Sequence, residues 1–346
     1  GPQVALVPQR AGLVPTSTSA QSIEARCRGT ITKSRFACIS LSRSGTPLAG
    51  IFTGKKQNFN LGNDVKNTLV TSNVQWNTSL GSVQFITGYN KLHQEYALDF
   101  FNGTVINTAA GNVAPNPAGG FTLASIGDFK QVSQEIKLTG DLNENTRYVA
   151  GLYYFDERDT SDFGDWLGTG PTTGLVLEDR ILKNKATAFA AYSQWDLKFA
   201  QAWTLTLGGR YTDETKKIDF IANANPRLAA PTVATRVSSA NLVALGIPLK
   251  QKTGLFTPRV ALKFDVSPDV NFFVSATNGF KSGGWNARGT TAVANQPFSP
   301  EKVWSYEAGM RSDLFDRKVR FNVTAFRLDV KDLQTPAAFV NPANGA

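Results

Sequence analysis

The sequence predicts an all-β chain, namely an antiparallel, up-and-down transmembrane β-barrel that is incomplete, with about ten strands present. Three observations carry this prediction. Apolar and polar residues alternate along many segments of the chain. These segments run roughly ten to twelve residues, which is the length a tilted strand needs to cross a bilayer. Their connections alternate between a few residues and about twenty to forty, whereas compact soluble domains use few long loops.

The alternation is clearest within residues 255–329. Val260, Leu262 and Phe264 alternate there with Ala261, Lys263 and Asp265. Trp203, Leu205, Leu207 and Tyr211 alternate in the same way with Thr204, Thr206, Gly208 and Arg210. Successive side chains of a strand point to opposite faces, so each strand has one apolar and one polar face. Charged groups would be costly in a dry core but suit a hydrated lumen, which places the apolar face against lipid. The stretch 148–155 breaks the pattern, because both of its faces are apolar.

Five hairpins follow from this pattern. Their strands are expected at 65–78 and 80–95, 130–140 and 146–156, 185–198 and 203–213, and on either side of the short turns at 267–269 and 315–317. Long loops are expected at 96–129, 157–184, 214–254 and 281–301. In outer-membrane barrels the short turns face the periplasm and the long loops face outside.

Aromatic residues gather near the expected short turns. They are Trp76, Trp195, Phe199, Trp203, Phe264, Phe272 and Phe315. Transmembrane barrels carry aromatic girdles where the apolar band meets the interface, so we interpret this group as one girdle. Core packing is the alternative interpretation.

Composition separates the first part of the chain from the rest. The formal net charge is +9, and residues 1–56 contain eight basic residues against Glu24 alone. The remainder is near balance, which gives a nucleic-acid role little electrostatic support. No run of eighteen apolar residues occurs, so a transmembrane helix is excluded. We expect residues 1–54 to be unstructured or non-native, a transit peptide being the weaker alternative, and residues 55–346 to form the partial barrel. Cys27 and Cys38 are the only cysteines and do not make a metal site.

Two stretches resemble the barrel of TonB-dependent outer-membrane receptors. One is SQEIKLTGDLNENTRYVAGLYYFDE, and the other is GFKSGGWNARG followed by FSPEKVWSYEAGMRSDLFDRKVRFNVTAFRLDVKDLQ. The residues that match the family pattern are Gly279, Phe280, Ser282, Gly283, Gly284, Asn286, Pro300, Glu301, Tyr306, Glu307, Gly309, Asn322, Phe326, Asp329 and Asp332. The resemblance covers about residues 54–334, and its order and spacing are more specific than any single motif.

The resemblance implies a twenty-two-stranded barrel in the bacterial outer membrane, plugged by an N-terminal domain. It also implies uptake of a scarce nutrient, most often a ferric siderophore, with energy from the TonB complex. The sequence shows no plug, no TonB box and about half of the strands, so we expect a fragment of a longer chain that does not transport alone. The expected partners are outer-membrane lipid, the TonB complex through the missing plug, and a small-molecule ligand. We expect a monomer and no nucleic acid.

No catalytic, cofactor or metal site is expected. His93 is the single histidine, and we expect it to be structural. The acidic residues Asp156, Glu157, Asp159, Asp162 and Asp165 lack the spacing of a calcium loop and are expected in a solvated loop. Aromatic and basic side chains in long loops suit a siderophore by stacking and cation–π contact. The candidate ligand-binding residues are Phe163, Trp166, Lys281, Trp285 and Arg288. For the two tryptophans, packing of the loops against the rim is the alternative.

Two other functions share part of this evidence. A plug-free, porin-like passive channel would have the same strands, and only sequence upstream would separate it from a receptor. A soluble, β-rich carbohydrate-binding or hydrolytic protein would bury its apolar faces and stay monodisperse without detergent.

Overall fold

A computed structural model describes residues 21–26, 52–54, 56, 62–99, 106–108, 111–113, 121–168, 174–225 and 236–335. Almost every described element is a strand. The longest are β2 (Gly62–Thr78), β3 (Gly81–Asp99), β6 (Phe121–Asn143), β7 (Thr146–Gly168), β8 (Gly174–Phe199), β9 (Trp203–Ala222), β10 (Lys250–Ser267), β11 (Val270–Lys281), β14 (Glu301–Leu314) and β15 (Val319–Lys331). Together with β1 (Gln21–Arg26) they form one antiparallel sheet in the order β1-β2-β3-β6-β7-β8-β9-β10-β11-β14-β15.

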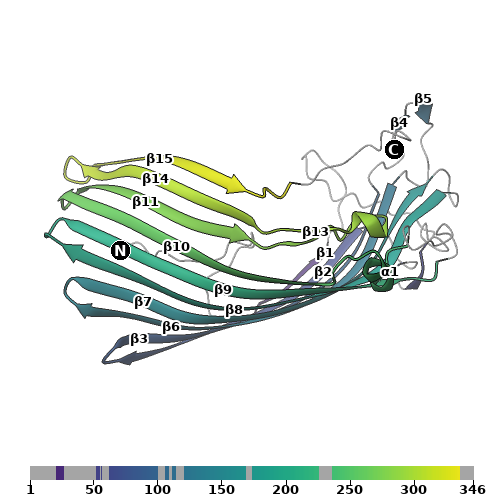
Figure 1. Cartoon of the computed structure of the whole chain (residues 1–346), viewed down its shortest axis with the longest axis horizontal. Coiled ribbons are helices and arrows are strands. Elements are labelled where there is room, and N and C mark those ends of the chain that lie inside the picture. Colours follow the sequence, from purple (N-terminus) through teal and green to yellow (C-terminus); the bar gives the residue numbers. More distant parts are fainter. Residues whose placement is uncertain are drawn as a thin grey trace.

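Each long strand therefore pairs with the next long strand of the chain, which is the up-and-down topology that the sequence predicts. Figure 1 shows the sheet as an open, curved trough with the hairpin turns at one end. The smaller elements lie at the other end: β4 (Ile106–Thr108), β5 (Gly111–Val113), α1 (Ser239–Ala244), β12 (Gly284–Trp285), the 3-10 turn Ala292–Ala294 and β13 (Pro297–Phe298). An open sheet with this topology is consistent with part of a barrel. Among the described residues, no helix is long and apolar enough to span a bilayer.

One face of the sheet, here called the outer face, carries large apolar side chains that no other described residue covers. Leu205 pairs with Leu262 across β9 and β10, and neither is buried. Strongly exposed members of this face include Val74, Phe85, Ile136, Leu152, Phe189, Leu207, Phe256, Val274 and Val323, each more than a third exposed. A soluble sandwich would bury such a surface, so its exposure favours contact with lipid. The opposite, inner face carries the polar residues.

The predicted girdle at the short turns is confirmed in position. Trp203 stacks on Phe199 and lies 4.5 Å, centroid to centroid, from Phe264. Trp76 and Phe315 are 64% and 73% exposed. The turns themselves are tight, since Ala200 and Gln201 adopt positive φ.

The structure also places aromatic residues on the outer face farther along the strands, where the sequence analysis identified none. They are Tyr89, Tyr154, Phe189, Tyr211, Phe256 and Tyr306. Beyond them the outer face becomes charged, for example at Lys91, Asp156 and Lys252. The apolar band is thus bounded by aromatics on both sides, as in transmembrane barrels.

The predicted lengths of β2 to β10 and the bounds of the loops 96–129, 157–184 and 214–254 are wrong, whereas the loop 281–301 coincides with the connection between β11 and β14. β6, β7 and β8 run 23, 23 and 26 residues, and they include most of the expected loop 157–184 and residues 121–129 of the expected loop 96–129. The acidic residues 156–165 lie on β7, where Asp156 and Asp162 point to the outer face and Glu157, Asp159 and Asp165 to the inner face. Beyond the membrane both faces of a strand meet water or polar neighbours, so its alternation of apolar and polar residues disappears and the sequence resembles a loop.

The structure explains why residues 148–155 are apolar on both faces. Tyr148 and Leu152 face outward, whereas Tyr153 and Phe155 stack on the inner face. The guanidinium of Arg210 lies 5.2 Å from the ring of Tyr153 and 5.7 Å from that of Tyr192, whose hydroxyl donates to Glu135 at 2.5 Å. The inward aromatics therefore belong to a polar network and are not a second lipid face.

Most of residues 1–54 lie outside the described residues, so the prediction for this segment stays a prediction. Its described parts are β1, which pairs with β2, and residues 52–54. Thr53 donates its N–H to Asp179 at 2.8 Å, and Lys56, three positions later, forms ion pairs with Asp162 and Asp179. This short stretch is therefore held on the outer face near the loop end of β7 and β8.

Candidate binding site above the lumen

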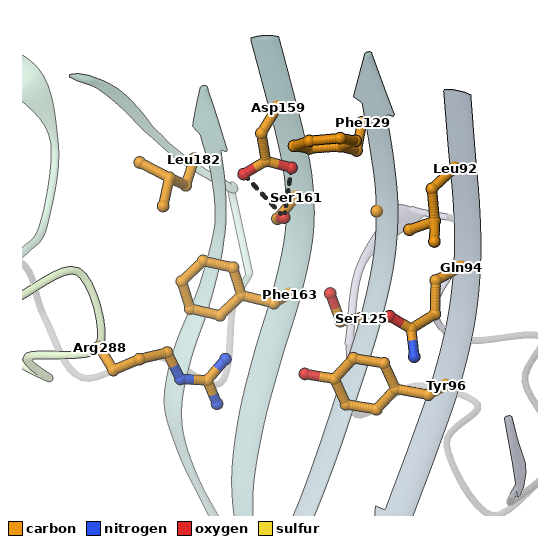
Figure 2. A pocket seen from close by; sticks show the side chains of 11 residues that line it. Leu92, Gln94, Tyr96, Ser125, Phe129, Asp159, Ser161, Phe163, Leu182 and Arg288 are labelled. Atoms are coloured by element: carbon orange, nitrogen blue, oxygen red, sulfur yellow. Dashed lines mark hydrogen bonds between the residues drawn. The ribbon is translucent and has the colours of Figure 1, made fainter. Parts of the chain in front are cut away.

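A cavity of about 290 Å³ opens on the inner face at the loop end of β3, β6 and β7. β3 contributes Leu92, Gln94 and Tyr96, β6 contributes Ser125, Gly127 and Phe129, and β7 contributes Asp159, Ser161 and Phe163, with Leu182 and Arg288 completing the lining. These residues alternate along each strand and so share one face. Figure 2 shows Tyr96, Phe163 and Arg288 near one end of the cavity, and Phe129, Asp159 and Ser161 near the other.

Asp159 forms the acidic end of the cavity. It accepts hydrogen bonds from the Ser161 hydroxyl at 3.2 and 3.4 Å. The residue lies beyond the apolar band of β7, which ends near Tyr154. Burial raises the pKa of Asp159, and the bond from Ser161 only partly offsets this effect.

Phe163 lies at the other end of the cavity, away from Asp159. It is 2% exposed, and two guanidinium groups approach its ring, Arg180 at 5.0 Å and Arg288 at 4.7 Å from the centroid. Arg180 also lies 5.2 Å from the ring of Phe220. Cation–π contact is stronger where the cation is desolvated, as Arg180 is. The buried ring thus helps to hold two positive charges at the edge of the cavity.

Two carboxyl groups accompany these arginines. Glu178 lies 2.5 Å from Arg180, and Asp165 lies 2.8 Å from Arg288. Burial raises the pKa of Glu178 to about 8; Arg180 opposes this shift and Asp165 adds to it. Burial also raises the pKa of Asp165 and lowers that of Arg180. At neutral pH Glu178 therefore holds a proton much of the time, and the two arginines outweigh the carboxylate charge around them.

Arg180 also fixes the connection between β11 and β14. Its Nη2 donates to the carbonyl oxygens of Ala287 at 2.8 Å and Gly289 at 3.1 Å. The connection itself is ordered by the β12–β13 pair and by Asn295, whose amide donates to the carbonyl oxygens of Gly289 and Thr291. Arg288 is thus positioned by its neighbours on both sides, and this arrangement brings it from β12–β13 to the cavity on β7.

An apolar cluster supports this arrangement beside the cavity. Its buried members are Ile218, Phe220, Val237, Leu242, Ile247, Trp285 and Ala292, from β9, α1 and the two connections. Trp285 donates its indole N–H to the carbonyl oxygen of Pro248 at 2.7 Å. Ser238 caps α1 by accepting from the N–H of Asn241. The connections before β10 and after β11 therefore pack against each other on the inner face.

The structure brings together two of the five candidate ligand residues. Phe163 and Arg288 meet at the cavity, while Trp285 lies in the apolar cluster. Trp166 is fully buried on β7, and its indole nitrogen has no hydrogen-bond partner among the described residues. Lys281 is exposed at the end of β11, opposite Glu301. None of these last three lines the cavity.

Sequence reasoning missed Arg180, Glu178 and the β3 residues Gln94 and Tyr96. The triplet Glu178-Asp179-Arg180 has apolar residues on both sides. Charged residues within an apolar stretch indicate a buried polar site. This signal went unused because the stretch resembled a loop. No sequence signal indicated that the loop ends of β3 and β7, which are separated by β6, line one cavity.

His93 lies on the outer face, away from the cavity. It forms hydrogen bonds with Asp128 at 2.9 Å and Glu95 at 3.3 Å. The bond to Asp128 raises the pKa of His93. Across the described part of the chain, no cluster of three or more His, Cys, Asp or Glu residues could hold a metal ion.

Comparison with known proteins identifies one family. The family described as "TonB dependent receptor-like, beta-barrel" matches residues 33–346. The metal-pseudopaline receptor CntO of Pseudomonas aeruginosa is 26% identical over 148 residues, which cover 43% of this chain and 18% of that receptor. The matched part of the chain therefore spans less than a fifth of this relative.

Solved structures show the same fold. The ferric yersiniabactin uptake receptor FyuA of Yersinia pestis has a TM-score of 0.54 at 17% identity, over 79% of this chain and 36% of that one. The siderophore receptor PiuA of Acinetobacter baumannii has a TM-score of 0.54 at 15% identity, over 76% and 40%. The pyoverdine receptor FpvA of Pseudomonas aeruginosa, bound to pyoverdine, has a TM-score of 0.52 at 15% identity, over 77% and 36%.

Proposed function

The chain belongs to the TonB-dependent receptor family of the bacterial outer membrane, and we propose that it is the part of such a receptor that takes a ferric siderophore from outside. The observation that carries the proposal is the inner-face cavity at the loop end, where Phe163 and Arg288 lie side by side. Several similar proteins are named as siderophore or metal-chelate receptors.

The chemistry of the cavity fits a ferric chelate. Such complexes combine a bulky organic ligand with anionic oxygen donors. Arg288 offers a side chain that is 45% exposed, which leaves donors free beside its bond to Asp165. Tyr96, Gln94 and Ser125 add hydroxyl and amide groups within the same lining. The cavity is near the lower limit of ligand pockets, so we infer that it holds one portion of the ligand while the rest lies in the lumen.

Transport itself rests on the complete receptor. The energy would come from the TonB complex acting through a plug domain. The barrel described here would supply the wall, the inner polar face and the outer binding surface. We propose that the described strands act as a rigid frame, because their backbone hydrogen bonds are satisfied from strand to strand.

Uptake by the full-length receptor tests this proposal. Cells producing it would be given ⁵⁵Fe as catecholate, hydroxamate or carboxylate chelates, with and without a functional TonB complex. We expect one chelate class to accumulate only when TonB functions. Arg288→Gln should weaken chelate binding by about tenfold to a hundredfold, the range for a charged hydrogen bond. Lys281→Gln, which removes a charge outside the cavity, should change binding less than about twofold.

Two results would contradict the proposal. TonB-independent entry of all small solutes at equal rates would indicate a passive channel. An equal effect of Arg288→Gln and Lys281→Gln on chelate binding would show that the cavity is not part of the binding site. That result would not contradict the assignment of the protein as a receptor.

A further inference from the structure

Six basic side chains form a continuous row across the outer face, here called the basic row. It consists of Lys91, Lys130, Arg158, Lys185, Lys217 and Lys250, one from each of β3, β6, β7, β8, β9 and β10. Each is the direct cross-strand partner of the next. Directly paired residues of an antiparallel sheet point to the same face, so all six project outward.

The basic row is unfavourable for the isolated protein. Like charges directly opposite each other on neighbouring strands destabilise a sheet. Asp156 lies 3.0 Å from Arg158 and 3.5 Å from Lys185 and relieves part of this repulsion. For the other four, no ion pair occurs within the described residues, and all four are exposed. Asp128 and Asp219 lie on the same face, two positions along the strand from Lys130 and Lys217, so the protein's own carboxylates balance the six charges only in part.

The height of the basic row above the apolar band indicates which negative groups lie opposite it. Lys91 lies two positions beyond Tyr89, and Arg158 and Lys185 lie four positions beyond Tyr154 and Phe189. With a rise of about 3.3 Å per residue and a tilt near 40°, these are heights of about 5 to 10 Å above the aromatic boundary of the apolar band. That is the depth of the lipid head groups. Lys217 and Lys250 stand higher, because a row perpendicular to tilted strands climbs along the barrel.

We propose that the lower part of the basic row, Lys91, Lys130, Arg158 and Lys185, binds the phosphate groups of lipids in the leaflet on the loop side of the membrane. Lysine is a compact charge on a flexible stem, so several lysines can adjust to phosphates spread over neighbouring head groups. Basic residues near a membrane surface are attracted strongly to anionic lipid. The basic row meets the lipid where the apolar band ends, so one surface contacts acyl chains below and phosphates above.

The test uses the full-length receptor purified in uncharged detergent. Bis-phosphorylated lipid A is titrated, and dephosphorylated lipid A and inorganic phosphate serve as separate arms. Binding is followed by native mass spectrometry and by the thermal midpoint. The triple variant K91Q/K130Q/K185Q removes charge near the aromatic boundary. The control K198Q/R317Q/K318Q removes three exposed charges at the short turns, the opposite end of the strands.

We expect the phosphorylated lipid to bind the unmodified receptor, with an affinity that falls as salt rises. The K91Q/K130Q/K185Q variant should lose about tenfold or more, and the control less than about twofold. Without lipid the triple variant should melt at the same or a higher temperature than the unmodified receptor, because repulsion is removed. With phosphorylated lipid that order should reverse.

Equal affinity for phosphorylated and dephosphorylated lipid A would overturn the proposal, and this comparison needs no variant. So would competition by inorganic phosphate at the concentration of the lipid, which would indicate a free-phosphate site. Equal lipid binding by the triple variant and the control would also overturn it.

Discussion

At the residue scale, the most unusual group is Glu178, a buried carboxyl whose pKa is raised to about 8. In the unfolded chain the group has its ordinary pKa of 4.5. Between these two values the folded protein binds a proton that the unfolded chain has lost. Stability must therefore fall as the pH rises through this window and level off above about pH 8.

The variant Glu178→Gln tests this sign, because it keeps the shape of the protonated acid and cannot titrate. We expect the thermal midpoint of the unmodified protein, measured against E178Q, to decline from pH 5 to pH 8 and then stay constant. A difference that is flat over this range, or that grows with pH, would show that Glu178 is ionised throughout. Glu301→Gln, at the loop end of β14 and only half-buried, provides the control.

Arg180 is the second residue whose role can be isolated. Its two bonds to the carbonyl oxygens of Ala287 and Gly289 hold the connection that carries Arg288. Hydrogen bonds from a charged group contribute about 1.5–3 kcal/mol each. We expect Arg180→Gln to speed amide hydrogen exchange in residues 284–296 by about tenfold or more.

Arg158→Gln is the matched control for this measurement, since Arg158 is an exposed arginine on the adjacent strand. It should leave exchange in residues 284–296 unchanged. Exchange that responds equally to both variants would mean that the connection is held by its own β12–β13 pair and the apolar cluster, without Arg180.

At the scale of elements, close strand packing depends on a few glycines. A Cβ at Gly151 on β7 would lie 2.5 Å from the Tyr192 hydroxyl and 2.8 Å from the carbonyl oxygen of Ile136. The backbone oxygen cannot move without shifting β6. We expect Gly151→Ala to lower the free energy of unfolding by about 1–3 kcal/mol, the usual cost of overpacking.

Gly279 on β11 is the matched control, because a Cβ there meets nothing within 4 Å. Gly279→Ala should change stability little, as judged by denaturant unfolding of the refolded receptor. If both substitutions cost the same, the effect would reflect the loss of glycine in a strand and not the contact with Tyr192 and β6.

The elements also show where sequence reasoning succeeds and where it ends. Within the membrane, one face meets lipid and the other a polar interior, so the alternation near Leu205 and Leu262 predicts the strands and the orientation of their faces. Beyond the aromatic boundary this difference between faces is lost, and β7 and β8 continue for about ten residues with no periodic signal. Phe163 and Arg288 could be proposed from residue type alone. Their contact could not, because Arg288 lies 125 residues after Phe163, on a connection that folds inward.

At the scale of the whole molecule, the sheet presents two different surfaces. The outer face is an apolar band between two sets of aromatics, followed by the basic row. The inner face is polar and ends in the cavity with Arg288. The two surfaces are opposite faces of the same sheet. Alternate residues of each strand therefore contact either lipid on the outer face or ligand on the inner face.

Spin labels attached on β9 and β10 of the full-length receptor, reconstituted in lipid, test this central claim most directly. Labels at Leu205, Leu207 and Leu262 should be relaxed by oxygen, which concentrates in acyl chains, and protected from a water-soluble nickel complex. Labels at the alternate positions Thr204, Thr206 and Lys263 should lose the oxygen effect. Labels at Leu205, Leu207 and Leu262 that neither reagent reaches would place them in a dry protein core and contradict the account.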